Sequence, residues 1–352
     1  MSHKILITGG SGYVGAMLVR EFSKQEDVDA LFVIDKESPS DLYAHNPKVT
    51  FRQVNISDDT WQEEARQFSP DIVIHCAWQI RELYGEKAKQ TKWNIVGSDN
   101  VFDFVFTTPS VKKFIHFSTV ASYGAYPTNT LEHRFTEKEN FRKSDYLYAE
   151  EKRIAELHLK DKYEQAKEKG TTPQVFIVRP ASITGPRGRY THIRFGLQSA
   201  LSGQFKKTWI HRVIASILSF VPITKKWCRQ FVHEDDVVNS VLLLALSEIK
   251  GEYEAFNLCP PGTLVTGKDM ARLVGKKSLL LPPWFLRIIF SILWKLTRGK
   301  IPTSPGGWKS YSYPIAVDGS KLTSLCGYRY LYESEDAFTK KEGRYMEFVE
   351  KE

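Results

Sequence analysis

The chain has 352 residues, which is enough to bury a sizeable core in one large domain or in two. Its composition, with 42% hydrophobic and 26% charged residues and no low-complexity tract, is that of a globular protein and excludes long disordered segments. Basic residues exceed acidic ones by eight (49 against 41), which suits a phosphate-bearing ligand or an anionic membrane surface. Because the charges are scattered and no zinc-finger or RNA-binding signature accompanies them, we expect no nucleic-acid partner.

The N-terminal half alternates short apolar runs with segments of helical length. The runs are continuous and rich in β-branched and aromatic residues, as in strands that helices cover on both faces of a parallel sheet. They predict a doubly wound α/β fold of the Rossmann type. The predicted strands lie at 4–8, 31–35, 49–56, 71–77, 112–118 and 176–180.

A glycine-rich turn follows the first predicted strand. The stretch KILITGGSGYVGAMLV places Gly9, Gly12 and Gly15 between that strand and a helix, where backbone N–H groups can contact a pyrophosphate. Asp35 ends the next strand twenty residues beyond Gly15. A carboxylate there accepts hydrogen bonds from the adenosine ribose hydroxyls and repels a 2′-phosphate. The two features predict a dinucleotide site for NAD rather than NADP.

Two Tyr-Lys pairs with the spacing of one helix face follow the strand at 112–118. Ligands of a parallel α/β sheet bind at the carboxyl ends of its strands, and Tyr148 begins a helix near that edge. Tyr163 lies about 22 Å further along the same helix axis. We therefore predict chemistry for Tyr148 and Lys152, and we expect Tyr163 and Lys167 to be solvated helix residues.

The chemistry expected of the first pair is acid-base catalysis coupled to hydride transfer. Tyr148 would exchange a proton with a substrate oxygen, and Lys152 would lower the tyrosine pKa from about 10. The hydroxyls of Ser118 and Thr119, just past the strand end, can hydrogen-bond the same substrate oxygen.

After about residue 180 the alternation breaks into turn-rich pieces and isolated helices. We expect residues 1–180, together with about 228–258, to form the dinucleotide-binding domain. Residues from about 181 to 227 and from 259 to 352 are expected to form a smaller α/β substrate-binding region.

Two apolar helices are predicted in this region, at 209–221 and 284–298. Arg287 and Lys295 interrupt the longer one and the other is too short, so neither is expected to span a membrane. A basic amphipathic helix can lie on a membrane surface, but we expect both helices to cover a core or a lipophilic pocket.

The four cysteines, Cys76, Cys228, Cys259 and Cys326, are far apart and fit neither a disulfide framework nor a metal site. We expect free thiols, and no metal. The N-terminus MSHKILITGG has no signal-peptide apolar region, so a cytoplasmic protein is expected.

In order and spacing, these motifs resemble the extended short-chain dehydrogenase/reductase family, in its NAD-dependent epimerase/dehydratase branch. Further elements that resemble the family are HCAW (75–78), NIVGSDNV (94–101), RPASITGP (179–186) and RQFVHEDDVV (229–238). Trp78 departs from the family pattern by replacing a small residue, and Asn55 replaces the usual Asp.

The resemblance implies roles for individual residues. Thr119, Tyr148 and Lys152 match the catalytic residues, and a homodimer through helices 94–108 and 148–165 is implied. The implied substrate-binding residues are Trp78, Thr119, Ser182, Arg187 and Arg229. The implied cofactor-binding residues are Gly9, Gly12, Tyr13, Val14, Gly15, Asp35, Asn55, Ile56, Cys76, Ala77, Trp78, Asn94, Ser118, Tyr148, Lys152, Arg179 and Pro180.

Three functions stay open. Val120-Ala121 stands where dehydratases of the branch carry Asp-Glu, so we favour a nucleotide-sugar 4-epimerase-like reaction, with Arg229, Arg187 and Arg189 on a diphosphate. The alternative is an NAD(P)-dependent dehydrogenase or reductase of a lipophilic hydroxyl or ketone, similar to hydroxysteroid dehydrogenases, which the apolar helices motivate. A non-catalytic dinucleotide sensor is disfavoured because Thr119, Tyr148 and Lys152 are all present.

Overall fold

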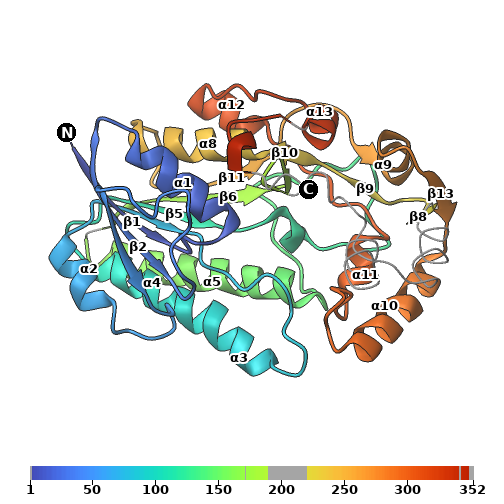
Figure 1. Ribbon diagram of the computed structural model, residues 1–352, viewed down its shortest axis with the longest axis horizontal. Coiled ribbons are helices and arrows are strands. Elements are labelled where there is room, and N and C mark those ends of the chain that lie inside the picture. Colours follow the sequence, from blue (N-terminus) through green and yellow to red (C-terminus); the bar gives the residue numbers. More distant parts are fainter. Residues whose placement is uncertain (1, 171, 189–219, 341, 349–352) are drawn as a thin grey trace.

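A seven-stranded parallel sheet forms the centre of the molecule (Figure 1). The computed structural model describes residues 2–170, 172–188, 220–340 and 342–348. The strands of the sheet are β1 (His3–Thr8), β2 (Val28–Asp35), β3 (Val49–Gln53), β4 (Ile72–His75), β5 (Lys113–Phe117), β6 (Gln174–Pro180) and β11 (Tyr253–Leu258). Their order is β11-β6-β5-β4-β1-β2-β3, and every neighbouring pair is parallel. The predicted doubly wound α/β fold is confirmed.

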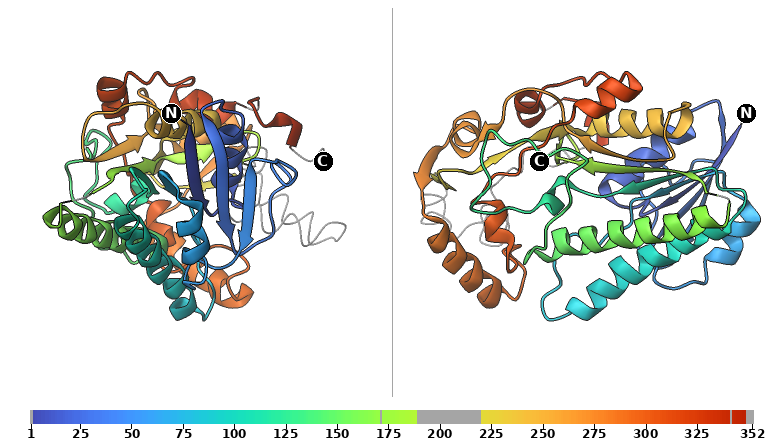
Figure 2. Two further views of the ribbon diagram at one scale, coloured as in Figure 1. Left: turned by 90° about the vertical axis from the view of Figure 1, so that its left-hand side faces the viewer. Right: turned by 180° about the vertical axis from the view of Figure 1, so that it is seen from behind.

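Helices cover both faces of this sheet (Figure 2). One face carries α1 (Tyr13–Ser23) and α8 (Glu234–Leu246), and the other carries α2 (Gln62–Phe68), α4 (Gly97–Thr107) and α5 (Leu147–Glu168). Side chains of β1 alternate between the two cores: Ile5 and Ile7 pack on the first face and Leu6 on the second. Because both faces are buried, the strands read as unbroken apolar runs.

The strand order reverses beside β1, since the chain continues to β2 and β3 on one side and to β4 on the other. The loops that leave β1, β4 and β5 therefore diverge around a crevice at the carboxyl edge of the sheet. Three short helices follow there: α3 (Lys87–Thr91), the π-helical turn η1 (Lys92–Val96) and the 3-10 helix η2 (Val120–Tyr123).

The smaller region contains three two-stranded sheets in the described part of the chain. These pair β7 (Ser182–Thr184) with β10 (Phe231–His233), β9 (Cys228–Arg229) with β12 (Val265–Thr266), and β8 (Phe220–Ile223) with β13 (Lys277–Leu280). Its helices are α9 (Gly267–Leu273), α10 (Pro283–Thr297), α11 (Gly307–Ser310), α12 (Ser320–Cys326) and α13 (Ser334–Thr339), followed by the 3-10 helix η4 (Met346–Phe348). The proposed domain boundaries stay a prediction.

The two predicted apolar helices have different outcomes. The helix expected at 284–298 is present as α10. Residues 209–219 of the other lie outside the described residues, and 220–221 belong to β8. Within the described ranges, no helix has both the length and the hydropathy to cross a bilayer. The four cysteines are free thiols, as expected.

The expectation of a solvated second Tyr-Lys pair is wrong for its tyrosine. Tyr163 is 2% exposed, and its ring lies 4.7 Å from that of Tyr253. Only Lys167 is exposed, and it pairs with Glu252 at 2.7 Å. Position 163 lies one turn beyond Leu159 on the face of α5 that meets the sheet, so the helix periodicity buries it.

A buried ion pair joins α5 to β6. Nε and Nη2 of Arg179 donate to the two carboxylate oxygens of Glu156 at 3.0 and 2.6 Å, and Nη1 donates to the Tyr123 hydroxyl at 2.9 Å. Both charged side chains are buried. The planar guanidinium satisfies the carboxylate bidentately, which fixes the carboxyl end of β6 against α5.

Replacing Glu156 with Ala should lower the free energy of unfolding by about 3–5 kcal/mol, because it leaves the Arg179 guanidinium buried without a counter-ion. Urea denaturation followed by circular dichroism measures the change. Glu164→Ala, an exposed position on the same helix, is the matched control and should cost little. A loss below about 1 kcal/mol for Glu156→Ala would show that this buried ion pair contributes no more to the free energy of unfolding than an exposed one.

Candidate active site

A cavity of about 1400 Å³ opens where β1, β4, β5 and β6 end. The predicted catalytic, cofactor-binding and substrate-binding residues line this cavity, except Arg179. Arg189, predicted to contact a diphosphate, lies outside the described residues. The Arg179 side chain is held by Glu156 and Tyr123 inside the protein. Its predicted cofactor contact is therefore corrected to a structural role, while the neighbouring Pro180 does line the cavity.

The glycine loop lies against the loop that follows β4. Gly9 has a φ of +77°, and a Cβ there would lie 2.4 Å from the backbone nitrogen of Ala77. A Cβ on Gly15 would lie 2.1 Å from the Gly9 carbonyl oxygen. Gly12 is the N-cap of α1 and provides no side-chain hydrogen bond to the helix. The helix therefore presents uncapped N–H groups and positive dipole charge to the cavity, as an anion site requires.

Asp35 connects the end of β2 to this loop. Its Oδ2 accepts a hydrogen bond from the Ser11 N–H at 2.9 Å, and its Oδ1 accepts one from the Glu37 N–H at 3.0 Å. The carboxylate is thus fixed at the cavity wall with lone pairs remaining for further donors.

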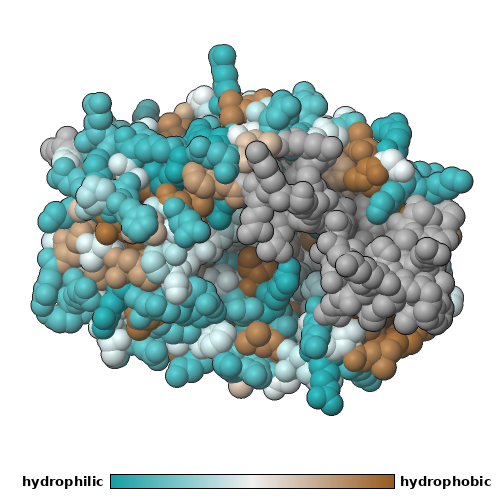
Figure 3. All heavy atoms as spheres, viewed as in Figure 1, coloured by the Kyte–Doolittle hydropathy of each residue, from teal (hydrophilic) through white to brown (hydrophobic). Residues whose placement is uncertain are grey.

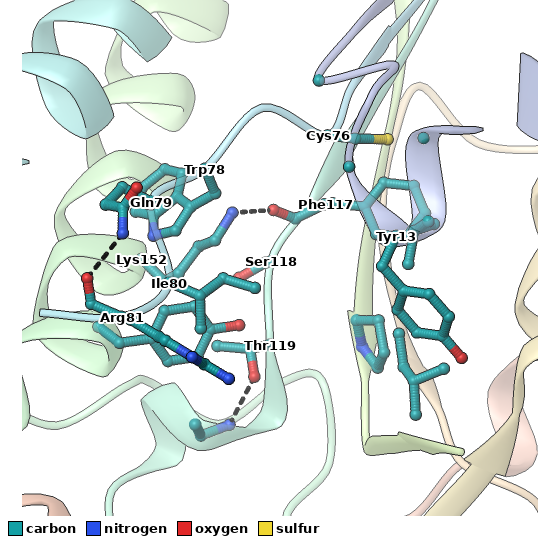
Figure 4. Close-up of a pocket in the computed structure, with 18 of the residues that line it drawn as sticks. Tyr13, Cys76, Trp78, Gln79, Ile80, Arg81, Phe117, Ser118, Thr119 and Lys152 are labelled. Carbon is teal, nitrogen blue, oxygen red and sulfur yellow. Dashed lines mark hydrogen bonds between the residues drawn. The ribbon is translucent and has the colours of Figure 1, made fainter. Parts of the chain in front are cut away.

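Tyr148 and Thr119 lie together beyond the end of β5. Burial raises the pKa of Tyr148 from its ordinary value, and a hydrogen bond with Thr119 opposes that rise. The Thr119 hydroxyl also accepts the Ala121 N–H at 3.2 Å as the N-cap of η2 (Figure 4). The cap fixes the Thr119 hydroxyl beside Tyr148 in the first turn of α5. A single substrate oxygen could therefore hydrogen-bond both hydroxyls.

Lys152 lies one turn further along α5 and is almost fully buried. Its ammonium donates to the Phe117 carbonyl and lies 3.6 Å from the centroid of the Trp78 ring (Figure 4). Burial lowers the pKa of Lys152 to about 7. The Trp78 ring, which stands where the family has a small residue, therefore contacts the predicted catalytic lysine through a cation–π interaction.

Two buried polar atoms beside the lysine have no partner among the described residues: Oγ of Ser118 and Nε1 of Trp78. Both residues line the cavity. A buried hydroxyl and a buried indole N–H without partners are costly, which is typical of groups that bind a ligand. The Cys76 thiol nearby has its pKa raised by burial and stays protonated.

Asn94 supports the site from inside the protein. It lies in the π-helical turn η1, donates to Glu151 at 2.7 Å and accepts the Gln79 N–H at 2.7 Å. The contact fixes the loop of Trp78 and Gln79 against α5. Its role is positional, although the residue also borders the cavity.

The loop 185–188 closes onto the glycine loop. The Tyr13 hydroxyl donates to the Glu234 carboxylate, which also accepts the N–H groups of Arg187 and Gly188 at 3.1 and 3.0 Å. Arg187 in turn donates to the Tyr13 carbonyl at 3.3 Å. Arg187 therefore lies beside the glycine loop rather than at the far end of the cavity. The sequence does not single out Glu234, because its contacts join segments far apart in the chain.

Aromatic side chains surround Arg229 at the other end of the cavity. Its guanidinium lies 4.8 Å from the Tyr311 ring centroid and 5.7 Å from that of Trp227. Tyr146 and Tyr313 also line this end, and burial raises the pKa of Tyr146. Tyr146 is the N-cap of α5, two residues before Tyr148, whereas Tyr311 and Tyr313 reach the cavity from a segment distant in sequence.

Solved structures with the same fold include two enzymes bound to nucleotides. UDP-glucose 4-epimerase of Thermotoga maritima with UDP-glucose is 21% identical, with 96% of both chains covered and a TM-score of 0.66. The Bordetella bronchiseptica enzyme WbmG in complex with NAD and UDP is 19% identical, with 96% of this chain and 92% of that chain covered and a TM-score of 0.67.

Among curated relatives, dTDP-glucose 4,6-dehydratase of Neisseria meningitidis is 32% identical over 139 residues. The match covers 34% of this chain and 39% of that enzyme, so it spans well under half of either protein. A family model described as the NAD dependent epimerase/dehydratase family matches residues 5–259, most of the present chain. On this match, the chain belongs to the NAD-dependent epimerase/dehydratase family.

Proposed function

We propose that this protein binds NAD in the cavity and catalyses a 4-epimerase-like reaction on a nucleotide sugar. One observation carries the proposal: a single cavity brings Thr119, Tyr148 and Lys152 together with the glycine loop and with Arg229. The glycines keep the α1 N-terminus open to a pyrophosphate, and Asp35 stands where ribose hydroxyls would donate to it. The unpartnered Ser118 hydroxyl supplies a polar contact deeper in the cavity.

The protein's own groups would control the proton and the orientation of the substrate. When bound, the nicotinamide would accept a hydride from the substrate carbinol carbon and return it. Tyr148 would take the hydroxyl proton, and Thr119 would hydrogen-bond the same oxygen. The Thr119 hydrogen bond opposes the effect of burial on the tyrosine pKa. A Lys152 ammonium one turn along α5 would also favour the phenolate over the phenol.

Water elimination is disfavoured by the residues beside Thr119. Val120 and Ala121 form the first turn of η2 and carry no ionisable group, so no acid stands there to protonate a leaving hydroxyl. An epimerase needs none. It needs only to remove a hydride from one carbon and a proton from the hydroxyl on that carbon, and to return both. The cavity must also leave room for the sugar to turn.

The far end of the cavity suits a nucleoside diphosphate. Arg229 offers a charged fork for phosphate, and its stacking on Tyr311 orients that fork. Aromatic rings such as those of Tyr146 and Tyr313 give flat apolar surfaces for a base or a sugar. The UDP and UDP-glucose bound by the two structural relatives belong to this chemical class.

A dehydrogenase or reductase acting on a lipophilic hydroxyl is the second candidate. The exposed Ile80 lines the same cavity, and Tyr84, four residues further along the chain, contacts the Trp294 ring of α10. Such an enzyme would exchange its cofactor in each turnover.

A homodimer through α4 and α5 is also proposed, supported by the exposed apolar side chain of Leu157 on α5.

The first experiment separates these candidates. The purified protein is denatured, and the released nucleotide is identified by chromatography and absorbance. We expect one NAD per chain, because an epimerase regenerates its cofactor and need not release it. An empty site that added NAD or NADP fills reversibly would favour the dehydrogenase, and binding of neither would overturn the cofactor proposal.

Replacing Tyr148 with Phe should lower turnover by about a thousandfold, because the variant cannot exchange the substrate proton. UDP-glucose is the first substrate probe, and epimerisation is followed by chromatography. NAD affinity, measured by calorimetry, should change less than about threefold, since only one hydroxyl is removed. Tyr163→Phe makes the same change on the same helix outside the cavity and should keep full activity. Equal turnover of the two variants would refute the proton-transfer role.

The buried Lys152 should also give the nucleotide-free protein a distinctive pH dependence. Its pKa is lowered to about 7 in the folded chain, whereas an unfolded lysine titrates near about 10.4. Between these values the unfolded chain binds the proton and the folded chain does not, so the free energy of unfolding rises with pH. Lys152→Met should remove a rise of about 1.4 kcal/mol per pH unit.

Urea denaturation across that pH range, compared between wild type and variant, measures this contribution. The exposed Lys169→Met is the matched control and should follow the wild type. If the two variants show the same pH dependence, the ammonium of Lys152 is not desolvated in solution.

A further inference from the structure

Helix α10 has an apolar face that no other described element covers. Trp284, Ile288, Ile292 and Leu296 recur at every fourth position, and their exposure ranges from 46% for Ile288 to 78% for Leu296. The space-filling view shows hydrophobic side chains exposed where α10 lies (Figures 1 and 3). Four large side chains in line on one helix are more than the scattered apolar residues of an ordinary surface.

The exposed face is not the one that attaches α10 to the protein. Leu286 and Trp294 are buried on the other side, and the Trp294 ring contacts that of Tyr84 at 5.4 Å. The helix is therefore apolar on two sides, whereas a helix that only covers a core needs one apolar stripe. Our expectation of a helix that covers a core is met by the inner side alone.

The apolar surface continues beyond the helix. Leu279 and Leu280 of β13 are 48% and 60% exposed and precede α10 directly in the chain. Phe285 lies next to Trp284, and their rings meet edge to face at 5.6 Å. We call the exposed side chains of Leu279, Leu280, Trp284, Phe285, Ile288, Ile292 and Leu296 the α10 face.

Basic side chains outnumber acidic ones beside the α10 face. Between Asp269 and Asp318 the sequence has no acidic residue. Arg287 and Lys295 are exposed on α10 itself, and neither forms an ion pair within the described ranges. The basic residues of this stretch are Arg272, Lys276, Lys277, Arg287, Lys295, Arg298, Lys300 and Lys309. Of these, Arg272 pairs with Asp269 and Lys309 pairs with Asp145.

The combination of exposed apolar and basic side chains determines which occupant fits. A second copy of the chain, related by a two-fold axis, would bring Arg287 and Lys295 of both copies to the same interface, where like charges repel. Nucleic acid would match the charge but would leave the apolar stripe without a partner. An anionic bilayer surface matches both, since apolar side chains enter the headgroup region while lysine and arginine remain at the phosphates.

We propose that the α10 face docks the protein onto an anionic membrane surface, with the helix lying in the plane of the interface. The helix does not span the bilayer, in agreement with its 15 residues and the charges it carries. Trp284 and Phe285 lie at the N-terminal end, where aromatic rings anchor a helix at the level of the headgroups.

Binding to vesicles tests the proposal. The full-length protein is sedimented with phosphatidylcholine vesicles and with vesicles that also contain phosphatidylserine. We expect binding to the anionic vesicles that weakens as salt is raised. Leu296→Glu should weaken it by about tenfold or more, because it places a carboxylate against the anionic surface. Arg287→Gln and Lys295→Gln should each weaken it about fivefold.

Matched controls separate docking from general effects of charge and hydropathy. Leu325→Glu changes an exposed leucine on α12, and Lys169→Gln removes an exposed cation from the end of α5. Both should bind vesicles like the wild type, and circular dichroism verifies that all variants are folded.

Two results would overturn the proposal. One is that wild-type protein does not sediment with anionic vesicles at low salt. The other is concentration-dependent self-association in analytical ultracentrifugation that Leu296→Glu abolishes, which would assign the α10 face to a second copy of the chain. Released-nucleotide analysis of the same preparation is independent of both results, so the proposed function stands or falls separately.

Discussion

The site depends on one constraint, namely that all seven strands of the central sheet run in the same direction. Both faces of such a sheet must be covered by helices, so the sheet interior offers no place for polar chemistry. Every carboxyl end meets at one edge, and the loops that leave β1, β4, β5 and β6 converge there. The glycine loop, Trp78, Thr119 and Pro180 are neighbours for that reason, although more than a hundred residues separate the first from the last.

Two parts of the molecule depart from the usual distribution of polar and apolar groups, in opposite directions. At the cavity, an ammonium is buried beside an indole ring, and the Ser118 hydroxyl is buried with no partner in the described part of the chain. On α10, large apolar side chains face outward. Neither arrangement favours the isolated folded chain, since desolvated charge and hydrated hydrocarbon both raise its free energy. Sequences retain such departures mainly where a ligand or a surface compensates for them.

Local pattern predicted six of the seven strands of the sheet and much of the site, but it did not predict β11. Apolar runs, the glycine spacing and the Tyr148–Lys152 spacing each report geometry within one strand, turn or helix, and these predictions placed their residues at the cavity. Pattern failed where tertiary contacts decide. Tyr163 looks solvated in a polar stretch of α5 but is buried against β11. The position of Arg187 depends on Glu234, and the role of Tyr311 depends on how a distant loop returns to the cavity.

The hydrogen bond between Tyr13 and Glu234 joins residues 221 positions apart, one in the first helix and one at the start of α8. The ribosome makes the glycine loop early and the carboxylate that braces it much later. A nascent chain that has completed the first six strands therefore has the phosphate-contacting backbone but not the residue that holds the 185–188 loop over it. The 185–188 loop can be held against the glycine loop only after the start of α8 has been made, so the final geometry of this wall of the cavity waits for a helix that is synthesised after the first six strands of the sheet.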